Sequence, residues 1–322
     1  MLITLPLILF IVLTELSIGA FAVLFLLDWR NMVKRSFLIT YAFIYIFLTG
    51  LTYLFQLGFS NSQLLNTFSL LDKGWTGFLS LPLLLFFLLL LPYTIFLLAD
   101  KKAGVDGKVE ERTIVSRVRI LRLVSGGLGV LAGLITLFVL GMIYRPMASS
   151  SLAGVFIVGS FFAAALALGG VMTAMWLGHW YLVTPALSEK PLQFAAILVL
   201  LGILAEVAFA FTGAPAVPSH PQTTRPVVTA TSTVTVTAAT PAPGTATVKP
   251  SDVPTVTPLS TGAIGWLRIV IGFVLPLLLM AFILKLIRDR AFQSATGMLY
   301  LVVVMTLAGE AMSRGLFLTG LQ

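Results

Sequence analysis

Eight apolar segments, each long enough to cross a lipid bilayer, take up most of this chain. A membrane-spanning helix needs about 20 mainly apolar residues. Backbone groups in lipid must satisfy their hydrogen bonds internally, so such segments fold as helices. Only 10% of the residues are charged, whereas soluble domains contain about 25%. The predicted fold class is therefore an all-α integral membrane protein, a bundle of eight transmembrane helices. The expected spans are residues 3–27, 36–58, 75–98, 120–143, 152–180, 192–212, 264–287 and 295–318.

Basic residues alternate between the predicted loops and indicate the orientation of the bundle. The loops after spans one, three, five and seven hold most of them, together with the start of span four: Arg30, Lys34, Arg35, Lys101, Lys102, Lys108, Arg112, Arg117, Arg119, Arg122, Lys190, Lys285, Arg288 and Arg290. The opposite side holds Lys73, Arg145, Arg225, Lys249 and Arg268. Because cytoplasmic loops are enriched in Lys and Arg, both termini are expected outside. The net charge of +8 reflects these loops and does not indicate nucleic-acid binding.

The segment between spans six and seven differs in composition from the rest of the chain. Residues 213–263 are rich in Thr, Pro, Ala and Val and nearly uncharged. Such tracts cannot form a packed core and resemble solvated or O-glycosylated stalks. We expect a disordered extracytoplasmic loop that separates helices one to six, in residues 1–212, from helices seven and eight, in residues 264–322. It is either a tolerated insertion or a docking arm for an outer partner.

Three carboxylates and one guanidinium group lie away from the ends of the predicted spans. They are Glu15 in span one, Glu206 in span six, and Glu310 with Arg314 in span eight. A charge at the bilayer centre costs at least about 2.5–3.5 kcal/mol, which falls when Glu310 and Arg314 face each other at i, i+4. The predicted orientation gathers these groups in the outer half of the membrane if the helices are neighbours. They either carry protons or only fix helix packing.

Histidine and cysteine content limits the cofactors that this chain can hold alone. It has no cysteine, which removes iron–sulfur ligation, thiolate metal sites and disulfides. Of its two histidines only His179 lies in a span, so haem held by two intramembrane histidines is excluded. His179 stands beside Trp180 and Tyr181 at the expected cytoplasmic interface. These residues form an aromatic belt, or His179 binds a quinone carbonyl or a lipid headgroup.

Three segments resemble the membrane anchor subunit of dimethyl sulfoxide reductase and its polysulfide reductase relatives. The first span, from Leu5 to Phe21, is similar to the family's opening helix. Gly265-Trp-Leu-Arg-Ile-Val-Ile271 is similar to its Trp-Arg-Ile-Val segment at helix seven. Gly309-Glu-Ala-Met-Ser-Arg-Gly-Leu-Phe317 is similar to its Gly-Glu-x-x-Gly-Arg-x-x-Phe ending and is the most specific match. The resemblance covers both ends of the chain and span seven.

The resemblance implies a haemless anchor for anaerobic electron transport in the cytoplasmic (inner) membrane of a prokaryote. Such a subunit takes electrons from quinol or menaquinol and passes them to an iron–sulfur subunit on the outer face. That subunit then supplies a molybdopterin catalytic subunit. By this resemblance Glu310 and Arg314 would orient or deprotonate quinol, with Glu15 as a nearby proton acceptor.

The chain departs from the family at two positions of the quinol site. Gln56 stands where the family has a histidine, and Leu79-Ser-Leu-Pro82 replaces its Leu-Ser-Asn-Glu. Gln56 could donate a hydrogen bond to a quinone oxygen but cannot accept a proton. Two alternatives therefore stay open. One is a small-solute or proton transporter that uses Glu206, Glu310 and Arg314. The other is a structural or assembly subunit of a respiratory membrane complex.

Overall fold

The computed structural model describes residues 5–101, 103–104, 117–183, 188–212 and 261–319, and every regular element among them is a helix. Eight helical segments are long and apolar enough to cross a membrane, which confirms the predicted number of spans and identifies a multi-pass membrane protein. Seven of them are α1 (Leu5–Trp29), α2 (Arg35–Phe59), α5 (Ser80–Ala99), α7 (Arg117–Tyr144), α8 (Ser151–Val183), α9 (Lys190–Thr212) and α12 (Phe292–Thr319). The seventh span consists of α10 (Thr261–Arg268), η2 (Ile269–Val274) and α11 (Leu275–Arg288).

Three short helices complete the described elements. They are α3 (Ser62–Leu65), α4 (Lys73–Thr76) and the 3-10 turn η1 (Arg145–Met147). The predicted span boundaries agree with the helices to within a few residues at each end. The Thr/Pro-rich segment lies almost entirely outside the described residues.

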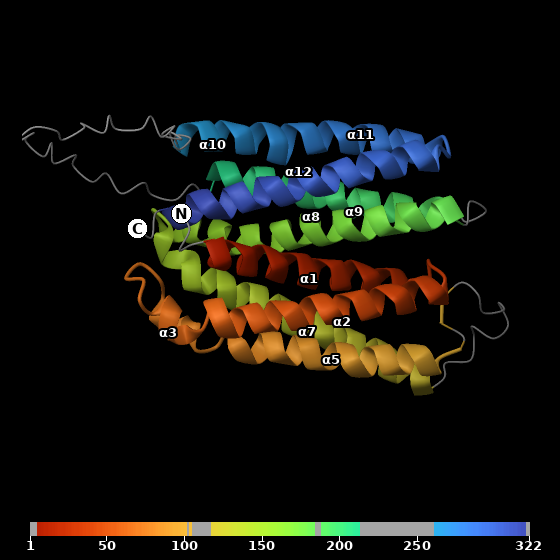
Figure 1. Cartoon of the computed structure of the whole chain (residues 1–322), viewed down its shortest axis with the longest axis horizontal. Coiled ribbons are helices and arrows are strands. Elements are labelled where there is room, and N and C mark those ends of the chain that lie inside the picture. The colour runs from red at the N-terminus through yellow and green to blue at the C-terminus, as the bar shows by residue number, and fades with distance from the viewer. Residues whose placement is uncertain (1–4, 102, 105–116, 184–187, 213–260, 320–322) are drawn as a thin grey trace, which may run out of the picture.

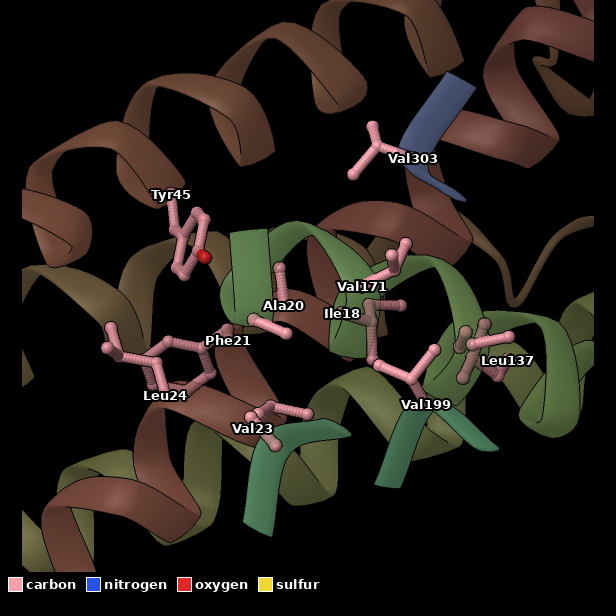
Figure 2. Close-up of a cluster of buried hydrophobic side chains, with 14 of the residues drawn as sticks. Ile18, Ala20, Phe21, Val23, Leu24, Tyr45, Leu137, Val171, Val199 and Val303 are labelled. Atoms are coloured by element: carbon pink, nitrogen blue, oxygen red, sulfur yellow. The ribbon is translucent and has the colours of Figure 1, made fainter. Parts of the chain in front are cut away.

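Helix α1 occupies the centre of the bundle. In Figure 1 it lies between α2, α5 and α7 on one side and α8, α9 and α12 on the other. In α1, 83% of the apolar stretch is buried, compared with 28–56% in the other seven spans. Figure 2 shows its side chains, among them Ile18, Phe21 and Leu24, in a buried cluster with residues of α2, α7, α8, α9 and α12. The residues on α1 are therefore enclosed by protein and not by lipid.

Small residues let α1 and α8 approach closely. A Cβ added to Gly19 would lie 1.7 Å from the carbonyl oxygen of Ala165, and one added to Gly169 would lie 2.0 Å from the backbone nitrogen of Ala20. Van der Waals packing drives helix association in membranes, so such contacts contribute directly to the stability of the bundle.

The seventh span contains a π-helical turn, η2, in its middle. There the N–H of Leu275 donates to the carbonyl of Val270, five residues earlier. The next residue, Pro276, has no N–H to donate, so the regular pattern is interrupted at this point. A Cβ added to Gly309 of α12 would lie 2.4 Å from the Cα of Gly272 in η2. The π turn and α12 therefore cross in backbone contact one residue before Glu310.

Candidate functional site

Arg314 is the centre of a buried ionic cluster. Its guanidinium forms an ion pair with Glu15 on α1, and its Nε lies 2.6 Å from Oε1 of Glu310, one turn earlier on α12. The side chains of all three residues are at most 4% exposed. The structure thus brings together the three residues that the sequence singled out for proton chemistry, including the predicted i, i+4 pair.

Aromatic side chains enclose Arg314 on the side of α7 and α8. Its guanidinium carbon lies 4.0 Å from the ring centroid of Phe161, a cation–π distance. Phe161 in turn stacks on Tyr144, with ring centroids 5.9 Å apart. This apolar enclosure excludes water from one side of the cation and strengthens its interaction with the carboxylates.

Two further charges extend the cluster toward the surface. Glu206 of α9 interacts electrostatically with Glu310, Arg314 and Arg268, and Arg268 of α10 interacts with both glutamates. Nε of Arg268 is buried and has no hydrogen-bond partner in the described structure. Sequence reasoning treated Arg268 only as a loop charge, although it stands within an apolar run. Its position inside an apolar run could have marked Arg268 as a candidate for a buried site.

The charges of the cluster do not balance. Glu15, Glu206 and Glu310 contribute three carboxylates, while Arg268 and Arg314 contribute two guanidinium groups. An isolated charge in a low-dielectric interior is strongly unfavourable, so neutrality calls for one proton shared among the carboxylates. The cluster thus holds one more carboxylate than guanidinium groups, and its ion pairs join α1 to α12.

A side pocket of about 280 Å³ reaches Arg268 from the surface. It lies where α9, α10, η2 and α12 meet, at the end of the bundle where α10 begins and α12 ends (Figure 1). Its lining residues are Ala210, Gly262, Gly265, Trp266, Arg268, Ile269, Phe273 and Leu316. The guanidinium carbon of Arg268 lies 5.1 Å from the ring centroid of Phe273. An apolar, aromatic pocket with one cationic donor suits a flat ring that carries oxygen atoms.

The other two predicted binding residues lie away from this pocket. Gln56 is buried on α2, where its Nε2 donates to the carbonyl of Ser60 at 3.4 Å, and its Oε1 has no hydrogen-bond partner in the described structure. His179 is exposed near the end of α8, with Nδ1 3.4 Å from the hydroxyl of Tyr300. It is 18 residues beyond Phe161 on the same helix, a rise of about 27 Å. His179 is thus separate from Arg314, as the sequence predicted.

A second buried ionic cluster lies at the opposite end of the bundle. Arg122 of α7 is 1% exposed and pairs with Asp28 of α1 at 3.1 Å and with Asp100, which caps α5, at 2.8 Å. The hydroxyl of Tyr93 donates to Asp28 at 3.0 Å. Sequence reasoning missed Asp28 and Asp100 and interpreted Arg122 as a topology signal, because charges at the ends of apolar runs are usual. Each aspartate directly follows an apolar run and stands beside basic residues, and that position was the available signal.

No protein-family model, curated protein or solved structure matches this chain.

Proposed function

We propose that this chain is the haemless membrane anchor of a respiratory oxidoreductase, and that it oxidises quinol or menaquinol at the pocket beside Arg268. One observation carries the proposal: a pocket suited to a flat ring lies next to a buried cluster with more carboxylates than guanidinium groups. The sequence resemblance to dimethyl sulfoxide reductase anchors supports the same assignment.

In this proposal the pocket binds the quinol and the ionic cluster accepts its protons. Oxidation of one quinol releases two electrons and two protons. Arg268 lines the pocket and would donate a hydrogen bond from its guanidinium group to a quinol oxygen. Glu206 and Glu310 would accept the protons, because they are the carboxylates that interact electrostatically with Arg268 of the pocket. The electrons would leave to an iron–sulfur subunit, which would supply a molybdopterin subunit.

The direction of proton release follows from the position of the cluster. Arg314 lies five residues before the end of α12, and Glu206 lies six before the end of α9, so each is about 8–9 Å below the helix end. Positive-inside bias assigns this end to the outer face, with both termini and the Thr/Pro-rich loop on the same side. Protons would therefore leave to the outside, the face on which the partner subunits would dock.

The first experiment is affinity purification of the tagged full-length protein in mild detergent, with mass spectrometry of its partners and extraction of bound quinone. Co-purification of an iron–sulfur subunit together with quinone is expected. Glu310→Gln should then lower quinol oxidation by about 10²–10⁴-fold, the usual contribution of one acid–base group. Asp100→Asn at the opposite cluster is the matched control and should leave turnover unchanged. A purified protein without partner or quinone would contradict the proposal.

One feature favours a second candidate, a proton or small-solute transporter. Buried ionic clusters stand at both Glu15 and Asp28 of α1, about 20 Å apart along the same helix. Ionisable residues within membrane helices commonly mark transport paths. Proteoliposomes with an internal pH dye separate the two functions, because a transporter would move protons without quinol and Glu206→Gln would stop that movement.

A further inference from the structure

A second pocket lies at the end of the bundle opposite the Arg314 cluster. It occupies about 200 Å³ between the α1–α2 connection, the end of α8 and the start of α9. Its lining residues are Met32, Val33, Lys34, Phe37, Leu177, Trp180, Tyr181, Ser188, Lys190 and Pro191. This volume is below the roughly 300–1,000 Å³ of pockets that enclose a whole small molecule. The pocket therefore suits one polar end of a larger ligand.

The charge around this pocket is positive. Lys34, just before α2, and Lys190, at the start of α9, both line it, and neither forms a salt bridge among the described residues. Arg30 lies nearby, with its guanidinium carbon 4.6 Å from the ring centroid of Phe194, one turn along α9 from Lys190. Helices α2 and α9 both begin here, and the positive ends of their dipoles add to the field of the lysines. The pocket attracts an anion.

The nearest described carboxylate does not cancel this charge. Glu189 precedes Lys190, but its carboxylate binds Arg290 at 2.7 Å. Hydrogen bonds from its own backbone and from Arg290 hold the pKa of Glu189 below its ordinary value, so it stays ionised and committed to that arginine. Glu189 pairs with Arg290 and also interacts electrostatically with Lys190, while Lys34 has no ion-pair partner among the described residues, so the surroundings of the pocket keep a net positive charge.

The remaining lining is apolar and lies at the level of the helix ends. Phe37 and Tyr181 are each 1% exposed, and Trp180 packs edge-to-face on Phe37 with centroids 5.8 Å apart. Trp and Tyr commonly lie at the depth of lipid headgroups. The backbone of Lys34 is fixed by a bridge to Gly104 and by its position before α2, so one of the two lysines is positioned by the fold. A ligand here must combine an anionic group with apolar chains.

We infer that this pocket, lined by Lys34, Lys190 and Trp180, binds the phosphate of an anionic phospholipid whose acyl chains lie along the bundle. Basic pockets between membrane helices are known to bind anionic headgroups, and each basic residue contributes about five-fold in affinity. This inference is independent of quinol oxidation, since the pocket lies at the other end of the helices.

The test uses the full-length protein in nanodiscs of phosphatidylcholine with a minor fraction of phosphatidylglycerol. Native mass spectrometry then counts the phosphatidylglycerol molecules that stay bound after the protein is released from the nanodisc. Wild type should retain it selectively, K34Q and K190Q should each weaken retention about five-fold, and the double variant about 25-fold. Lys285→Gln is the matched control, because Lys285 is exposed on the same face but does not line the pocket.

Two further measurements keep the test decisive. K34R/K190R should restore retention, and the thermal midpoint in pure phosphatidylcholine should be the same for the double glutamine variant and wild type. Equal retention by wild type and the double variant would overturn the inference. Displacement of the lipid by millimolar inorganic phosphate would overturn the assignment to a membrane lipid, because it would identify a site for free phosphate.

Discussion

The guanidinium of Arg314 binds the carboxylate of Glu15 across 299 residues of sequence, and so joins the last helix to the first one inside the bundle. The same guanidinium lies against Glu310. One cation therefore pairs with carboxylates of two helices. Removal of Arg314 leaves two buried carboxylates without their partner, whereas removal of either acid leaves the arginine with the other one.

Arg314→Met should destabilise the bundle by about 3–5 kcal/mol, because two buried carboxylates lose their common partner. Reversible unfolding in mixed micelles of a mild detergent and dodecyl sulfate measures this change. The double variant Arg314→Met/Glu15→Gln should lose less than the two single variants added together. Arg288→Met at an exposed position is the control and should stay within about 0.5 kcal/mol of wild type. If the stability losses of the two single variants add up to that of the double variant, the two residues do not interact.

Arg122→Met should cost a similar 3–5 kcal/mol, because Asp28 and Asp100 both lose their buried partner. The consequence for function should differ. Quinol oxidation per folded molecule should be retained in Arg122→Met and lost in Arg314→Met, since only the latter lies beside the pocket of Arg268. Turnover normalised to the folded fraction measures the difference. Equal loss in both variants would assign both clusters to helix packing alone.

Gly309→Ala should push α12 away from the π turn, because the new methyl would lie 2.4 Å from the Cα of Gly272. Overpacking of this kind costs about 1–3 kcal/mol and would also displace Glu310, so quinol oxidation should fall with stability. Gly297→Ala on the same helix is the matched control, since nothing lies within 4 Å of its added Cβ. There alanine should stabilise the helix by about 0.5–1 kcal/mol. Equal effects at the two glycines would refute the close crossing.

The orientation of the bundle can be measured with single cysteines, because the natural chain has none. A membrane-impermeant maleimide should label Gln63→Cys, at the end of the bundle near the Arg314 cluster, in intact cells or spheroplasts. Lys101→Cys, at the opposite end, should react only after permeabilisation. Both side chains are exposed in the structure, so a difference in labelling reports sidedness and not burial. The reverse pattern would place the cluster on the cytoplasmic face and exclude proton release to the outside.

Sequence reasoning predicted the number of spans because apolar length alone decides whether a segment can cross a bilayer. It also singled out Glu15, Glu310 and Arg314, since a charge in the middle of an apolar run is costly in lipid and usually has a partner or a function. It could not predict that Glu15 lies on the most enclosed helix, because α1 is no more apolar than the span Lys73–Ala99, of which only 33% is buried. The order of helices in space depends on small contacts such as Gly19 with Ala165, which hydropathy does not record.

The residues that sequence reasoning missed share a different property. Asp28, Asp100 and Arg122 lie near the ends of spans, where a charge is as easily explained by solvent as by a buried partner. The π turn of the seventh span could not be predicted either. Pro276 predicts that the helical hydrogen-bond pattern is interrupted, but not that the interruption is a π turn. Tertiary contacts decide these cases, and they join segments too distant in sequence for any local pattern to reveal.

Glu15 cannot pair with Arg314 until the last helix of the chain has been synthesised. At a synthesis rate of roughly 5–20 residues per second, α1 waits about 15–60 s in the membrane before α12 emerges from the ribosome. During that interval the most enclosed helix of the finished bundle carries an acidic group without its cation, and its neighbours must assemble around an incomplete centre. A nascent chain that stops before Arg314 therefore keeps a glutamate in the membrane without the arginine that pairs with it in the completed protein.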